Sequence, residues 1–97
     1  MEDTIIAALN HRSVLAFTYD GQPRTVHPHA LYREDHLRKV VLHAWQTEGR
    51  SNTRTPPCWG NFHLDKIIGL AVLDETFFGA QSDFNPKRFL RIIHSLN

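Results

Sequence analysis

The stretch SVLAFTYDGQPRTVHPH, residues 13–29, carries the clearest structural signal in this chain of 97 residues. Its first part is rich in β-forming side chains and predicts a strand over residues 13–19. Asp20-Gly21 then predicts a tight hairpin, because such a turn needs positive φ at both central residues. A return strand is expected over residues 24–29. On the first strand, one face should carry Leu15, Phe17 and Tyr19. On the second strand, one face should carry Arg24 and Val26, and the other face Thr25, His27 and His29.

Three further strands follow from the pattern outside this hairpin. They are expected over residues 39–45, 62–65 and 67–73, the last with a bend or bulge at Gly69. The charged residues 32–36 predict a tight connection between two of the strands. Residues 46–58 hold no large apolar side chain, and we expect them to form a long loop.

Each end of the chain predicts a helix. Asp3 is a candidate cap for a first helix, whose apolar stripe is formed by Ile5, Ile6 and Leu9. Asn85, followed by Pro86, predicts the start of a last helix. The apolar face of that helix would consist of Phe89, Ile92 and Ile93.

The connections between the expected strands are too short for helical crossovers, so the strands should be antiparallel. Residues 1–97 are too few for two independent cores and are expected to form one domain of the α+β class, mainly β. The expected architecture is a five-stranded, strongly bent antiparallel barrel of the Sm or SH3 kind, with a short N-terminal helix and a C-terminal helix.

Composition narrows the classes of function. Eleven Lys and Arg against ten Asp and Glu give a net charge of +1, so the chain lacks a strongly basic nucleic-acid footprint. Its seven histidines would add positive charge near pH 6. The single cysteine, Cys58, cannot form an internal disulfide, which favours a reducing compartment and a cytoplasmic location. The sequence contains no run of 18 apolar residues, so it predicts no membrane span.

Basic and aromatic side chains form the main candidate site. Strand parity places His43 and Trp45 on one face, and an adjacent strand could bring His63 near them. Stacking on an aromatic ring combined with neutralised phosphates binds single-stranded nucleic acid without base readout. The competing interpretation is that Trp45 packs under the long loop while the charges are solvated. The candidate ligand-binding residues are Arg24, His43, Trp45, Arg54, His63 and Lys66.

Metal binding and catalysis are the weaker interpretations. Zinc accepts nitrogen and sulfur ligands, but no short-spaced pair of cysteines is present. Cys58 with a histidine could form a nucleophile pair, yet no Gly-rich or oxyanion-type context surrounds it. We therefore expect no metal, no cofactor and no enzymatic activity. The side chains weighed as metal ligands are His27, His29, His43, Cys58 and His63.

The order of several short motifs over residues 4–93 resembles that of WYL domains. The motifs are Phe17-Thr18-Tyr19, Asp20-Gly21, Arg24-Thr25-Val26-His27-Pro28, Val40-Val41-Leu42, Trp59-Gly60-Asn61-Phe62-His63-Leu64-Asp65-Lys66-Ile67 and Phe84-Asn85-Pro86. The resemblance implies an Sm-like small barrel. It also implies a non-enzymatic regulatory module that senses single-stranded nucleic acid or a nucleotide. The setting that it implies is bacterial transcription regulation, often tied to phage defence or to DNA damage.

The alternative is a protein-interaction or oligomerisation module that has lost ligand binding. Val40, Val41 and Gly60 favour it, because they stand where the family has a Trp, a Tyr and an Arg. No helix-turn-helix is present, so reading duplex DNA would require a separate DNA-binding or defence protein as partner. We also expect a homodimer, because a small barrel with open edge strands gains from burying an edge against a second copy.

Overall fold

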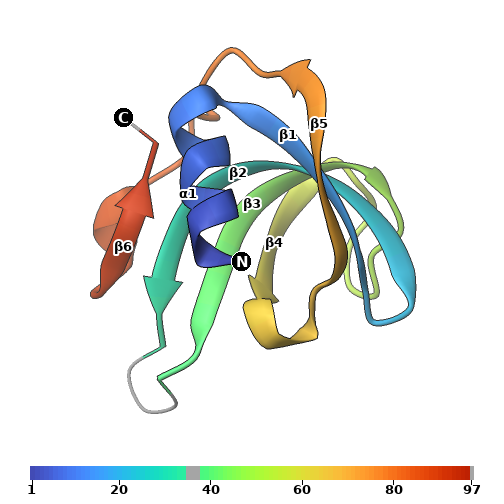
Figure 1. Cartoon of the computed structure of the whole chain (residues 1–97), viewed down its shortest axis with the longest axis horizontal. Coiled ribbons are helices and arrows are strands. Elements are labelled where there is room, and N and C mark those ends of the chain that lie inside the picture. Colours follow the sequence, from blue (N-terminus) through green and yellow to red (C-terminus); the bar gives the residue numbers. More distant parts are fainter. Residues whose placement is uncertain (35–37, 97) are drawn as a thin grey trace.

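The computed structural model describes residues 1–34 and 38–96, and it is mainly β with one N-terminal helix. The helix and strands are arranged as Figure 1 shows. The elements in chain order are α1 (Glu2–His11), β1 (Ser13–Tyr19), β2 (Gln22–Arg33), β3 (Val40–Gly49), β4 (Cys58–His63), the 3-10 turn η1 (Leu64–Lys66), β5 (Ile68–Thr76), the 3-10 turn η2 (Pro86–Arg88) and β6 (Ile92–Ser95).

The predicted hairpin joins β1 and β2. Tyr19 pairs with Gln22, so Asp20 and Gly21 alone form the turn. Their φ values of 52° and 73° are the left-handed pair that a two-residue turn of this type requires. The prediction for this segment is confirmed, except that β2 continues to Arg33 and therefore includes part of the expected connection. The remainder of that connection falls partly on residues 35–37, outside the described residues.

The strands form one antiparallel sheet in the order β4-β3-β2-β1-β5. Over the described residues, β4 and β5 do not pair with each other, so the bent sheet stays open instead of closing into a barrel. Figure 1 shows η1 joining the end of β4 to the start of β5, with α1 lying across the concave side of the sheet. The prediction of antiparallel strands is confirmed. The predicted closed barrel is not observed, because β4 and β5 remain the two edges of the sheet.

Burial of apolar side chains on the concave side holds α1 in place. Ile5, Ala8 and Leu9 of α1 are buried against the sheet. The predicted cap is wrong in one detail, because the helix already begins at Glu2 and Asp3 lies inside its first turn. The sheet contributes Leu15, Phe17, Tyr19, Val26, Leu31, Leu42, Ala44 and Phe62 to this core.

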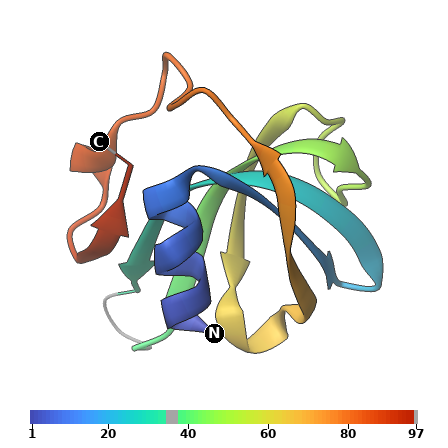
Figure 2. The ribbon, with the colours of Figure 1, turned by 45° about the horizontal axis from the view of Figure 1, so that its top comes forward.

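The predicted C-terminal helix is wrong. Asn85 does accept a hydrogen bond from the Lys87 amide, but the helical backbone ends after the single turn η2. The chain then enters β6, which pairs with residues 30–32 of β2. This edge of β2 is available because β2 extends beyond its pairing with β1, and β-branched side chains such as Ile92 suit a strand. Figure 2 shows β6 beside this end of β2.

The predicted strand boundaries differ from the observed ones on both sides of the long loop. β3 continues to Gly49, so the loop is confined to residues 50–57. Gln46 is buried and donates to the carbonyls of Glu48 and Arg50, which stabilises the extended end of β3. The strand expected over residues 62–65 is observed as β4, Cys58–His63, and residues 64–66 form η1. The irregularity expected at Gly69 is confirmed, because the pairing register between β1 and β5 shifts there and Gly69 has φ 66°.

Candidate functional site

The convex side of the sheet carries a second cluster, built from histidines and aromatic rings. It is covered by the segment between β5 and β6, which we call the C-terminal strap (residues 77–91). Figure 2 shows this segment arching away from β5 before it returns as β6. The ring contacts join His27, His29, Tyr32, His43, Trp45 and Trp59 of the sheet to Phe77, Phe84 and Phe89 of the C-terminal strap.

Trp59 and His43 form the centre of this cluster. Their rings are stacked, with centroids 4.4 Å apart and an interplanar angle of 13°. Trp59 donates its indole N–H to Asp83 of the C-terminal strap at 3.0 Å. Asn61 Oδ1 lies 2.9 Å from His43 Nδ1 and accepts from the Tyr32 hydroxyl at 3.3 Å. Burial lowers the pKa of His43 below its ordinary value, against the effect of the Asn61 hydrogen bond, which favours the neutral ring.

His29 connects the C-terminal strap to the sheet. Its side chain is fully buried, with Nδ1 2.9 Å from the His27 carbonyl, while Nε2 accepts the Gln81 amide at 3.0 Å. This pattern requires the neutral ring, because a protonated ring has no acceptor for Gln81. Burial lowers the pKa of His29 from 6.5 to about 4. The C-terminal strap is therefore held in place by an uncharged histidine.

A depression of about 480 Å³ opens beside this cluster, and we call it the outer-face groove. It lies in the size range of small-molecule sites. Two exposed arginines, Arg54 and Arg88, line it, and no acidic side chain does so among the described residues. The groove thus combines positive charge with an aromatic ring. Its lining residues also include His43, Thr53, Trp59 and Asn61.

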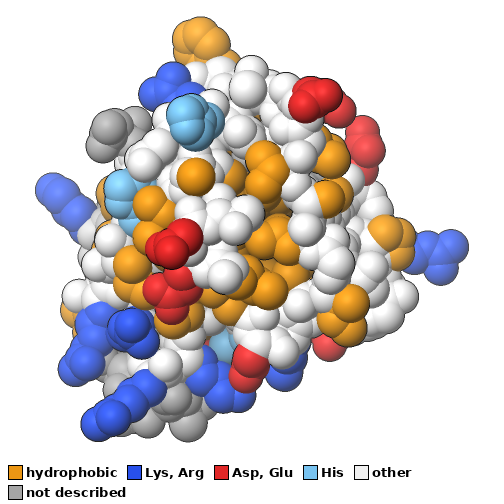
Figure 3. Space-filling model, viewed as in Figure 1, with side chains coloured by type: hydrophobic (Ala, Val, Ile, Leu, Met, Phe, Trp, Pro, Cys, Tyr) orange, Lys and Arg blue, Asp and Glu red, His pale blue; other side chains and the backbone are white. Residues whose placement is uncertain are grey.

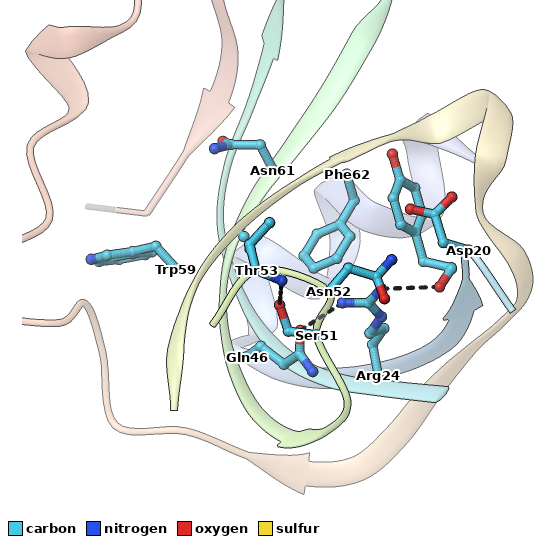
Figure 4. A pocket seen from close by; sticks show the side chains of 11 residues that line it. Asp20, Arg24, Gln46, Ser51, Asn52, Thr53, Trp59, Asn61 and Phe62 are labelled. Carbon is cyan, nitrogen blue, oxygen red and sulfur yellow. Dashed lines mark hydrogen bonds between the residues drawn. The ribbon is translucent and has the colours of Figure 1, made fainter. Parts of the chain in front are cut away.

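A smaller depression of about 170 Å³ adjoins the groove along β4, and we call it the Arg24 pocket. The two share Thr53, Trp59, Gly60 and Asn61. Figure 4 shows Trp59 and Asn61 on one side of the β4 ribbon and Arg24 on the other, beneath Ser51 and Asn52. The remaining side chains of this pocket include Tyr19, Asp20, Gln46 and Phe62.

The structure brings together only some of the predicted site residues. His43 and Arg54 line the outer-face groove, and Arg24 lies in the adjoining pocket. Trp45 contacts Trp59 edge-to-face at 5.1 Å but lines neither depression.

Two other predicted residues lie apart from the groove. His63 pairs through Nε2 with Glu34, and its amide donates to the Tyr19 hydroxyl at 3.1 Å. Lys66 is exposed in η1 and lines neither depression. The structure therefore does not bring these two residues to the groove that His43 lines.

Sequence reasoning missed Trp59, Asn61 and Arg88 as lining residues. Register could have found the first two, because Trp59 pairs with Trp45 and Asn61 with His43 in adjacent strands. Arg88 reaches the groove from the end of the C-terminal strap, where the sequence predicts a helix that starts at Asn85.

Packing against Phe62 explains why position 60 is a glycine. A Cβ built on it would lie 2.6 Å from the ring of Phe62, which is itself buried. A larger residue at this position would force the ring to move within the core.

The side chains weighed for metal binding and catalysis can now be placed in the fold. Within residues 1–34 and 38–96, no three His, Cys, Asp or Glu side chains converge on a point where they could hold a metal ion. Cys58 is a buried free thiol at the start of β4. In the same part of the chain, no helix has the length and apolar character needed to cross a membrane.

Comparisons of this chain with protein-family models, with curated proteins and with solved structures give no match.

Proposed function

We propose that this chain is a non-enzymatic, ligand-sensing module that binds a nucleotide or a short single strand of nucleic acid in the outer-face groove. The observation that carries the proposal is the composition of the groove, whose lining combines two arginines with an aromatic ring. Asp83, which accepts from the Trp59 indole, is not among the lining residues. Arginine is suited to phosphate because its planar fork matches two phosphate oxygens. Base contact with an aromatic ring adds affinity that is tolerant of sequence.

The groove supports a role for each lining group. Arg54 and Arg88 neutralise backbone phosphates, and Trp59 supplies the aromatic surface for a base. Asn61 is exposed, and its Oδ1 accepts from the Tyr32 hydroxyl and from His43 Nδ1, which fixes its orientation. This part of the site is therefore ordered before a ligand arrives, which reduces the entropic cost of binding.

The resemblance to WYL domains belongs to this proposal, as does an Sm-like origin for the open, bent sheet. It adds the biological setting: the module reports ligand occupancy to a separate bacterial DNA-binding or defence protein in the cytoplasm. The contact between the C-terminal strap and the groove supports such signalling, because Arg88 and Phe89 belong to the C-terminal strap while Trp59 and His43 belong to the sheet.

The proposal is tested by titrating the protein with short oligonucleotides over a range of salt concentrations. Two neutralised phosphates predict a slope of about −1.4 for log K against log salt, taking about 0.7 per phosphate. Arg88→Met should reduce the slope to about −0.7, and Lys66→Met is the matched control that should leave it unchanged. Binding weaker than millimolar at low salt would reject the proposal.

A specific observation favours a second candidate, a protein-interaction module. β5 is an edge strand without Lys, Arg or Pro, and its two charged residues, Asp74 and Glu75, stand together near its end. Its side chains Ile68 and Val72 are 68% and 47% exposed. Figure 3 shows apolar side chains gathered on the face of the molecule that carries α1 and β5. This second candidate uses surfaces away from the groove, and pairing of β5 with a second copy is its simplest form.

A further inference from the structure

Arg24 is the most unusual charged group among the described residues. Only 5% of its surface is exposed, although arginine is almost never fully buried unless it is paired. Within the described residues, no carboxylate oxygen lies within 4.0 Å of its guanidinium. A buried cation without a counter-charge is costly, and the cost falls when an anion approaches.

The protein satisfies this guanidinium only in part. Nη2 donates to the Tyr19 carbonyl at 3.1 Å and Nη1 donates to Gln46 Oε1 at 3.3 Å, which uses two of its five N–H groups. Nε is buried and has no hydrogen-bond partner. The rings of Tyr19 and Phe62 lie 5.8 Å from the guanidinium carbon and stabilise the charge without neutralising it.

The surroundings of Arg24 suit a small oxyanion. The Arg24 pocket has a volume of about 170 Å³, below the range that drug-sized ligands occupy. The loop residues Ser51, which is half-buried, and Asn52, which is exposed, border it and carry polar groups. Asp20 also borders it, but this side chain is exposed on the hairpin turn and makes no ion pair with Arg24.

We propose that the Arg24 pocket binds a phosphate group, and that this group is the terminal phosphate of the nucleotide or strand held in the outer-face groove. This inference rests on the proposed function for the identity of the ligand, and on Arg24 alone for the phosphate. The two depressions lie on opposite sides of β4 and share Thr53, Trp59 and Gly60 in their linings. Because β4 is an edge strand, a ligand that passes over its edge beside Thr53 would occupy both. The pocket is too small for a nucleoside. The site therefore selects the phosphorylated end of a strand, or a free nucleotide, over the internal phosphodiesters of a longer strand.

The first test uses inorganic phosphate as the probe and thermal unfolding as the readout. Phosphate at ten times its dissociation constant should raise the Tm of the wild-type chain by about 5 °C or more. Arg24→Met removes the buried charge and should abolish this shift, while Arg54→Met should retain it. A shift that persists in Arg24→Met shows an adventitious ion only and overturns the assignment.

A second variant keeps the test valid if Arg24→Met does not fold. Asp20→Asn leaves Arg24 in place and removes the acid at the rim of the pocket. It should tighten phosphate binding by several-fold. If Asp20→Asn instead lowers the Tm in phosphate-free buffer and phosphate gives no shift, Asp20 is the counter-ion of Arg24 in solution and the pocket assignment is wrong.

The last arm separates this inference from the proposed function. A short oligonucleotide with a 5′- or 3′-phosphate should bind at least tenfold more tightly than the same strand without a terminal phosphate. Arg24→Met should abolish this ratio. Equal affinity of phosphorylated and unphosphorylated strands rejects the phosphate pocket while nucleic-acid binding stands. A phosphate effect without any nucleotide binding rejects the proposed function while the pocket stands.

Discussion

Acidification should destabilise this protein through one buried histidine. The pKa of His29 is lowered from 6.5 to about 4 in the folded chain. Between these values the unfolded chain binds the proton more readily than the folded chain, so the free energy of unfolding falls as the pH falls. The stability contributed by neutral His29 is complete above about pH 6.5 and is lost progressively down to pH 4.

The magnitude follows from the size of the shift. A difference of about 2.5 pKa units corresponds to a maximum of about 3 kcal/mol, and about 2.4 kcal/mol of it is lost between pH 7 and pH 4.5. That is a large share of the 5–15 kcal/mol typical of a domain. Burial also lowers the pKa values of His27 and His43, which adds to the loss in the same direction.

The assay is urea unfolding at several pH values, with wild type compared with His29→Gln. Glutamine can accept the Gln81 amide hydrogen bond without titrating, so the variant should lose about 2 kcal/mol less than wild type between pH 7 and pH 4.5. His11→Gln is the matched control for the loss of one histidine, because His11 is exposed at the end of α1 and is not part of the buried cluster. Identical pH dependence of wild type and His29→Gln would refute the reasoning.

Three further predictions concern packing, association and metal content. Gly60→Ala should destabilise the fold by about 1–3 kcal/mol, because its Cβ would overlap the buried Phe62 ring; unfolding at the wild-type midpoint would contradict this. The chain should form a dimer through β5, and Val72→Lys should dissociate it in light-scattering measurements; a monomer mass for wild type at tens of micromolar removes the claim. Elemental analysis of protein purified without chelator should show no stoichiometric zinc, and one zinc per chain would return attention to His27, His29 and Cys58.

Local signals in the sequence predicted local structure well. The hairpin at Asp20-Gly21 and the irregularity at Gly69 depend on backbone conformations that few residues adopt, so the residue type indicates the geometry. The apolar stripe of α1 likewise depends only on helical spacing.

The failures arose where pairing with distant residues decides the structure. Asn85 and Pro86 start a helical turn, but Ile92 pairs with β2 some 60 residues away in sequence, and this pairing overrides the helical start. Gln46 is polar and predicted a loop, yet it is buried in β3. Tertiary context of this kind overrides propensity in short segments.

The candidate site shows the same division. His43, Arg24 and Arg54 were found from residue type and strand parity, and they do border the two adjoining depressions. Arg88 could not be found, because its position depends on the course of the C-terminal strap. The pairing of β3 with β4 would have placed Trp59 beside Trp45. The predicted strand over residues 62–65 begins after Trp59, so the sequence did not indicate this pairing.

The fluorescence of Trp59 tests the central claim most directly. Trp45→Phe leaves Trp59 as the only tryptophan, and it borders both the outer-face groove and the Arg24 pocket. Titration of this variant at low salt with a short 5′-phosphorylated oligonucleotide should quench or shift the emission with saturation below millimolar concentration, and Arg54→Met in the same background should weaken it. Emission that stays unchanged through millimolar oligonucleotide and nucleotide would contradict the account.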